Sequence, residues 1–95
     1  MLSMGHDGRI IRLTHLLQLD DEEKQRSLCQ LFRIGDELGL LILDISDLFA
    51  IARYVRANIA SFVDKFNVSI ETISFIEQQL RKMAESGRGQ ESLDV

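Results

Sequence analysis

The side chains that could carry out chemistry are few in this 95-residue sequence. Cys29 lies among apolar residues of an expected helix, which predicts a buried, inert thiol, because a nucleophilic thiolate needs a nearby base. His6 and His15 lack a spacing that would let them share a metal ion. Residues 20–23 are all acidic, but they lack the alternating oxygen ligands, mid-loop glycine and terminal glutamate of a calcium loop. We interpret this cluster as a helix cap.

The glycines do not form a phosphate-binding loop either. No strand precedes Gly5, Gly8, Gly35 or Gly39, and no Gly-Lys-Ser/Thr follows them. The sequence also lacks a paired acid and base and an activated nucleophile. We therefore expect no enzyme activity, no catalytic residue, no cofactor, no metal ion and no small-molecule substrate.

The element around which the chain is organised is the stretch 41–66. Apolar residues recur there in steps of three and four, which is the spacing of one helical stripe: Leu41, Ile45, Leu48, Ala52, Val55, Ile59, Phe62 and Phe66. The stripe predicts one long amphipathic helix over 41–66. Asn58 is a competent N-cap, so a break there is the alternative, but the unbroken stripe favours continuity.

Three further helices are predicted on either side of the central one, over 8–18, 21–38 and 69–85. Gly39 is suited to close the second helix, Asn67 to form a tight turn, and Ser69 to cap the last helix. The expected fold is all-α, a compact bundle of about four helices. Its domain organisation would be a flexible leader at 1–7, a single helical domain at 8–85 and a polar, flexible tail at 86–95.

The composition of the chain limits which partners it could bind and in which compartment it could lie. The formal net charge is −4, which repels a polyanion at long range. A single cysteine excludes an internal disulfide, and the longest apolar run, 40–43, is far too short to span a membrane. No secretory leader is evident. We expect a cytoplasmic protein that does not bind membranes.

The extent of the apolar stripe suggests self-association. Hydrophobic residues make up 45% of the chain, and a domain of this size has a small core, so part of the stripe should meet a second subunit or another protein. We expect a homo-oligomer, most simply a dimer through the central helix. The predicted dimer or partner interface comprises Leu41, Ile45, Leu48, Ala52, Val55, Ile59, Ile70 and Phe75. Phe75 should be exposed, since it points about 200° away from Ile73 on a helix.

The C-terminal half resembles a helix-turn-helix DNA-binding unit over residues 59–78. The residues that carry the resemblance are Phe62, Val63, Phe66, Asn67, Val68, Ser69, Ile73 and Ile76. In that family such residues hold two helices at a steep angle, so that the second enters a major groove. The resemblance implies DNA contacts by Ser69, Glu71, Ser74, Gln78 and Lys82. The sequence departs from that family in the bulky Val63, in Asn67 where glycine is favoured, and in an outward face over 69–78 without Arg or Lys.

Two functions follow from these observations. The first is a small non-enzymatic regulatory or adaptor protein that acts through helix-mediated self-association and binding to another protein. The alternative, implied by the resemblance, is a helix-turn-helix transcriptional regulator that binds DNA through residues 59–84.

Overall fold

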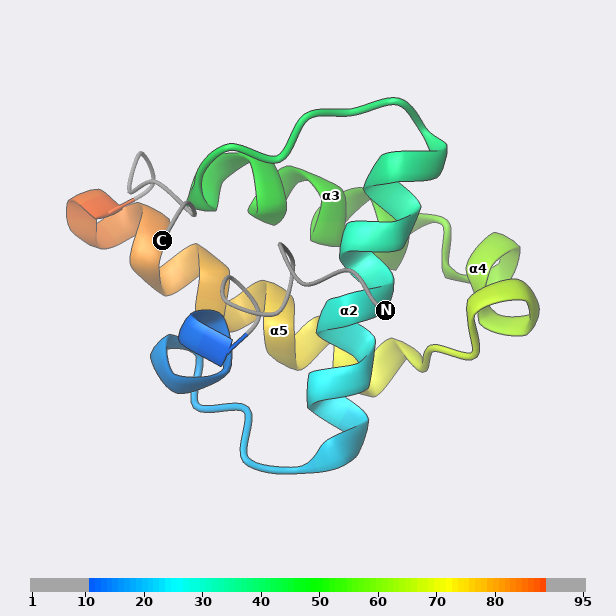
Figure 1. Ribbon diagram of the computed structural model, residues 1–95, viewed down its shortest axis with the longest axis horizontal. Coiled ribbons are helices and arrows are strands. Elements are labelled where there is room, and N and C mark those ends of the chain that lie inside the picture. Colours follow the sequence, from blue (N-terminus) through cyan, green and yellow to red (C-terminus); the bar gives the residue numbers. More distant parts are fainter. Residues whose placement is uncertain (1–10, 89–95) are drawn as a thin grey trace.

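The computed structural model describes residues 11–88, and the regular elements in this range are helices (Figure 1). A helical segment at 11–16 is followed by four α-helices and a π-helical turn: α2 (Glu22–Glu37), α3 (Ile45–Ala57), α4 (Ile59–Phe66), α5 (Ile70–Met83) and η1 (Ala84–Arg88). The predicted all-α class is confirmed. The leader expected at 1–7, the start of the first helix and the end of the tail lie outside the described residues.

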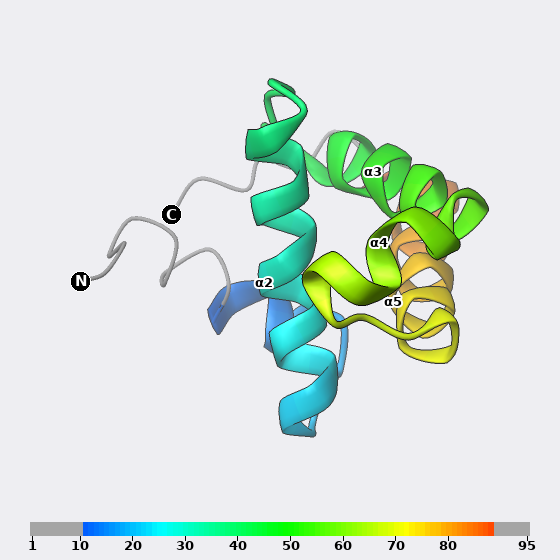
Figure 2. The same ribbon diagram turned by 90° about the vertical axis from the view of Figure 1, so that its right-hand side faces the viewer.

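The bundle is built on three helices that pack against one another. Helices α3 and α5 lie side by side, and α2 crosses both of them on one face (Figures 1 and 2). The segment at 11–16 lies beside α5, and α4 lies at the side of the molecule, next to α2 (Figure 2). This arrangement leaves both ends of α2 and most of α4 at the surface.

The core lies where α2, α3 and α5 meet. Each helix contributes apolar side chains at helical spacing, so that one stripe of each is removed from water. The largest side chains that are almost fully buried are Leu13, Leu17, Leu28, Leu31, Ile34, Ile45, Leu48, Val55, Ile73, Ile76 and Leu80. Full burial of one such side chain stabilises the fold by about 1.5–3 kcal/mol.

The two ends of α2 follow the prediction. Asp21 is its N-cap, and the carboxylate Oδ1 accepts a hydrogen bond from the Lys24 backbone N–H at 2.8 Å. Gly39 lies just beyond the C-cap Leu38 with a φ of 73°, a conformation that costs glycine little. The helix predicted over 21–38 is therefore confirmed.

The central stretch is not one helix, so the prediction of an unbroken helix over 41–66 was wrong. Asp44 starts α3 by accepting a hydrogen bond from the Asp47 N–H at 3.0 Å, and the residues before Asp44 are non-helical. Asn58 then ends α3, because its side-chain Nδ2 donates to the Tyr54 carbonyl at 2.9 Å while its own φ and ψ are −119° and 35°. This local hydrogen bond competes with continued helix.

The turn between α4 and α5 agrees with the prediction. Asn67 adopts the left-handed conformation, with a φ of 55°. The Ser69 Oγ accepts a hydrogen bond from the Thr72 N–H at 3.3 Å and caps α5. Helix α5 ends at Met83, and η1 continues for one wide turn, in which Gly87 has a φ of 90°.

Candidate interaction surfaces

Most of the predicted interface residues are used inside the chain. Ile45, Leu48, Ala52 and Val55 are fully buried in the core between α3 and its neighbours. Their assignment to a dimer or partner surface is corrected, because the stripe of α3 is already covered by α2 and α5. Ile59 is half-buried against the same core.

Two predicted interface residues do lie on the surface of the described chain. Leu41 is 78% exposed and Ile70 is 42% exposed. Leu41 belongs to the loop before α3, and Ile70 is the first residue of α5. They lie on different elements, so they do not extend the buried stripe.

Phe75 corrects another expectation. The side chain is half-buried and packs against the core, whereas the sequence predicted it to be exposed. The Lys24 Nζ lies 4.3 Å from the centroid of its ring, in the geometry of a cation–π contact. The prediction failed because α2 packs on α5 and its Lys24 side chain covers Phe75.

The residues implied to contact DNA are spread over α5 in different environments. Glu71, Gln78 and Lys82 are exposed, whereas Ser69 and Ser74 are half-buried. A carboxylate from α2 lies at the start of α5, close to the first of these residues.

Glu23 lies at the N-terminal end of α5. Its Oε2 accepts from the Thr72 Oγ1 at 3.1 Å and lies 3.5 Å from the Ser69 Oγ, which donates to it. A negative charge at this end suits the helix dipole. The same carboxylate would repel a phosphate approaching the helix start, which is where a recognition helix commonly meets DNA.

A charged cluster joins α3 to α5 on another side of the molecule. Glu77 is buried, with a side chain that is 4% exposed, and its Oε1 lies 3.0 Å from the Arg56 Nε. The Arg81 terminal nitrogen lies 3.9 Å from Oε2. Both guanidinium groups are about half-exposed, so the cluster presents two fixed cations to solvent. The sequence carries a signal for this pair, since Glu77 falls on the apolar stripe of Ile73 and Leu80, but it was not among the residues selected by spacing.

A shallow hollow of about 340 Å³ lies beside this cluster on α3. It is lined by Ala50, Arg53, Tyr54, Arg56 and Ala57. The Arg53 guanidinium carbon lies 5.6 Å from the centroid of the Phe49 ring, which holds that side chain against the helix. The hollow is therefore a positively charged surface, and none of its lining residues is a carboxylate, histidine, serine or cysteine.

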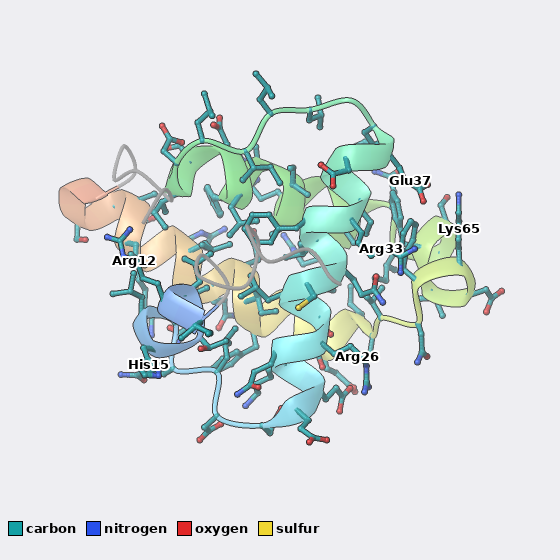
Figure 3. The ribbon with its side chains drawn as sticks, in the orientation of Figure 1. Arg12, His15, Arg26, Arg33, Glu37 and Lys65 are labelled. Atoms are coloured by element: carbon teal, nitrogen blue, oxygen red, sulfur yellow. The ribbon has the colours of Figure 1, made fainter. Side chains whose placement is uncertain are left out.

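The side-chain contacts between α2 and α4 include an ion pair and an aromatic ring. Figure 3 shows Arg33 and Glu37 on α2 directed toward α4, where Lys65 lies. The Lys65 Nζ is 3.0 Å from the Glu37 Oε1, and Arg33 and Lys65 both lie within 6 Å of the centroid of the Phe66 ring, at 5.9 and 5.5 Å. The contacts of Glu37 with Lys65 and of Arg33 with Phe66 join residues far apart in the sequence, so spacing could not have revealed them.

A second hollow, of about 310 Å³, lies where the first helical segment turns toward α2. Its lining residues are Thr14, His15, Gln18, Leu19, Asp20 and Gln25. His15 lies at the surface of this segment (Figure 3). In residues 11–88, no group of three or more His, Cys, Asp or Glu side chains is placed to hold a metal ion. None of the described helices is long and apolar enough to cross a membrane.

Comparison with known proteins identifies a family for nearly the whole chain. The model of a family described as Helicase HerA-like C-terminal matches residues 4–92. Searches of curated proteins and of solved structures each gave no match. From the sequence, a family resemblance was recognised over residues 59–78 only, and this recognition was wrong, because the family match covers residues 4–92.

The family match also corrects both functions inferred from the sequence. A domain of this family points to association with a helicase or ATPase, and not to a small regulatory adaptor or a helix-turn-helix transcriptional regulator. The corner formed by α4, Asn67 and α5 is present, but it is part of a helical domain of a different family. The chain belongs to the HerA-like helicase C-terminal family.

Proposed function

We propose that this chain works as a helical accessory domain of a HerA-type helicase or ATPase, and that it contributes binding surface to that machine without hydrolysing ATP. The observation that carries the proposal is the family match over residues 4–92. The sequence contains no Gly-x-x-x-x-Gly-Lys-Ser/Thr motif, which cradles the phosphates in P-loop motors. The motor would therefore lie on another segment or another chain.

The chemistry of the described residues supports a binding role. The charged groups of α3 and α5 form ion pairs that join helices, as in Arg56 with Glu77. The hollow beside them has cationic and aromatic walls and no serine, cysteine, histidine or carboxylate among its lining residues. The cytoplasm is the compartment that we propose, and the single cysteine is consistent with a reducing location.

The proposal is tested by mixing the purified chain with a HerA-type helicase that has an intact motor. We expect the two to co-migrate in size-exclusion chromatography, and the rate of ATP hydrolysis by the motor to change several-fold. The chain alone should not hydrolyse ATP. Absence of binding together with an unchanged rate would refute the proposal, and so would ATP hydrolysis by the chain alone.

A destabilised variant provides the control for this experiment. Leu48 is fully buried, so Leu48→Asp places a carboxylate in the core and should cost several kcal/mol. The variant should lose its helical circular dichroism and its effect on the motor together. An effect that survives loss of the fold would come from a nonspecific polypeptide contact.

A further inference from the structure

The loop between α2 and α3 exposes an unusual number of leucines. Leu38 is 44% exposed, Leu40 48%, Leu41 78% and Leu43 58%. Single exposed leucines are ordinary, but four within six residues form an apolar surface of the kind that marks an interaction site. We call residues 38–43 the leucine loop. It forms the long connection from the end of α2 to the start of α3 in Figure 1.

The leucine loop is held in place by its buried residue. Ile42 is 8% exposed and lies against α2, where a Cβ atom added to Gly35 would be 2.8 Å from the Ile42 Cδ1. Residues 40–43 are non-helical, and in this stretch Ile42 is buried while Leu41 and Leu43 on either side of it are exposed. The two leucines are exposed because their neighbour is anchored.

Hydrogen bonds fix both ends of this segment. The Leu40 N–H donates to the Gly35 carbonyl at 2.9 Å, and the Leu43 N–H donates to the Asp47 Oδ2 at 2.9 Å. The Asp44 carboxylate in turn accepts from the Asp47 N–H. A surface that is already ordered loses little conformational entropy on binding, which favours its use in docking.

The sequence on both sides of the leucine loop is acidic. The segment 36–47 contains Asp36, Glu37, Asp44 and Asp47 and no Lys, Arg or His. Glu37 is paired with Lys65 of α4, while Asp36 is exposed to solvent. The apolar surface is thus flanked on both sides by carboxylates.

This charge pattern selects one occupant. A second copy of the chain, docked symmetrically, would bring the two acidic segments together, and nucleic acid or an anionic membrane would be repelled in the same way. Charge complementarity favours a cationic surface around an apolar one. We propose that the leucine loop docks into an apolar groove of a partner protein whose rim carries Lys and Arg side chains. Identifying that partner with the motor rests on the proposed function above.

The test compares a loop variant with a matched surface variant. Leu41→Ser with Leu43→Ser removes two outward leucines, and Val63→Ser with Ile70→Ser removes two exposed apolar side chains from α4 and α5. All four positions are exposed, so circular dichroism should show both variants folded. With the HerA-type motor as probe, we expect the loop variant to bind roughly tenfold more weakly or worse, and the control variant to bind as wild type.

The acidic flank is tested separately. Asp36→Lys reverses an exposed charge beside the loop and should weaken binding to the motor and reduce its dependence on salt. Unchanged affinity in both the loop variant and Asp36→Lys, with wild-type binding intact, would overturn the docking proposal and leave the proposed function standing.

A synthetic probe separates the two proposals if the motor does not bind. The probe is a designed peptide that folds as an antiparallel helical hairpin with a groove lined by Leu and Ala. Two versions are compared, which differ only in having Lys or Glu side chains along the rim of that groove. The docking proposal predicts that wild type binds the Lys-rimmed hairpin, that the loop variant does not, and that wild type does not bind the Glu-rimmed hairpin. These results would support the docking proposal even if the proposed function fails. Failure of the Lys-rimmed hairpin as well would overturn it. Loop-dependent dimerisation in sedimentation, or loop-dependent binding to phosphatidylserine vesicles, would also overturn it.

Discussion

The Arg56 Nε lies 3.0 Å from the Oε1 of Glu77, a carboxylate that is almost completely removed from solvent. This ion pair joins α3 to α5, the two helices that share the largest contact in the fold. Glu77 Oε2 is buried without a hydrogen-bond partner in the described residues, and a terminal nitrogen of Arg81 lies 3.9 Å from it. The carboxylate therefore depends mainly on Arg56 for its compensation.

Removal of Arg56 should cost more than removal of a comparable arginine. We expect Arg56→Gln to lower the free energy of unfolding by about 1–3 kcal/mol, since it leaves a buried carboxylate poorly compensated, with a discount because Arg56 is half-exposed. Arg53→Gln on the same helix, which removes a contact with Phe49, should cost about 0.5 kcal/mol or less. Urea unfolding of both variants makes the comparison.

The double variant provides the control for this interpretation. Arg56→Gln with Glu77→Gln removes the uncompensated charge, so its loss of stability should be smaller than the sum of the two single losses. Additive losses, or equal losses in Arg56→Gln and Arg53→Gln, would contradict a specific role for the pair.

Helix ends that are set by local interactions were predictable from the sequence. Asp21, Gly39, Asn67 and Ser69 each set a helix end through their own backbone or through the next turn, and each does so in the structure. Their chemistry is local, so one sequence is enough to read it.

The break at Asn58 could not be read in the same way. The apolar spacing continues from Val55 through Ile59, so the stripe fits either one helix or two. What distinguishes the two is the backbone at Asn58, with φ and ψ of −119° and 35°, and the hydrogen bond from its side chain to the Tyr54 carbonyl, neither of which the apolar spacing reveals. Phe75 shows the same limit, because the Lys24 side chain that covers it comes from a distant part of the chain.

The functional error has a physical origin as well. The pattern around Asn67 stabilises a corner between two helices, and that corner is present between α4 and α5. Core packing alone produces the pattern, whatever the second helix contacts. The acidic Glu23 at the start of α5 was visible in the sequence, but its position there was not.

The cap at Asp21 predicts a pH-dependent contribution to stability. The backbone N–H of Lys24 donates a hydrogen bond to the Asp21 carboxylate. This hydrogen bond is the largest of the effects that lower the pKa of Asp21 from its ordinary value. A carboxyl group whose folded pKa is depressed stabilises the fold above its unfolded pKa, and this contribution is lost as the pH falls through the folded pKa. Asp21→Asn keeps a capping oxygen but no charge, so it should be less stable than wild type at about pH 6 and closer to it at about pH 2. Melting temperatures across this range measure the difference.

Asp36→Asn is the control for removing a surface carboxylate. A difference in stability between Asp21→Asn and wild type that grows toward low pH would contradict the assignment.

The left-handed turn at Asn67 predicts opposite outcomes for two small residues. With a φ of 55°, alanine there should be strained, and Asn67→Ala should cost about 1–2 kcal/mol. Glycine adopts this conformation without steric cost, so Asn67→Gly should differ from wild type by less than about 1 kcal/mol. Thermal unfolding of the pair tests this directly, and an alanine variant as stable as the glycine variant would show that the turn relaxes to a negative φ.

The close approach of Gly35 and Ile42 predicts that substitutions at these two positions have non-additive effects on stability. The same contact should hold the leucine loop in place. A Cβ at Gly35 would lie 2.8 Å from the Ile42 Cδ1 and 3.1 Å from the Ile51 Cδ1, so the side chains must move. Gly35→Ala gains about 1 kcal/mol of helix propensity, but overpacking costs about 1–3 kcal/mol, and the net change should be destabilising by about 0–2 kcal/mol. Ile42→Val removes the Cδ1 atom that would clash, so the double variant should be more stable than the sum of the single changes by roughly 1 kcal/mol. Gly35→Ala with Ile51→Val is the matched control and should show a smaller coupling, since its contact is longer.

Urea unfolding of the four proteins in each cycle gives the two coupling energies. Amide chemical shifts give an independent measure, because pushing Ile42 outward should disturb Leu41 and Leu43, and the second substitution at Ile42 should restore them. If the loop is anchored as the structure shows, Gly35→Ala alone should also weaken loop-dependent binding, and Gly35→Ala with Ile42→Val should recover it. Additivity within about 0.5 kcal/mol, with unchanged shifts at 41–43, would mean that Ile42 does not hold the leucine loop in place.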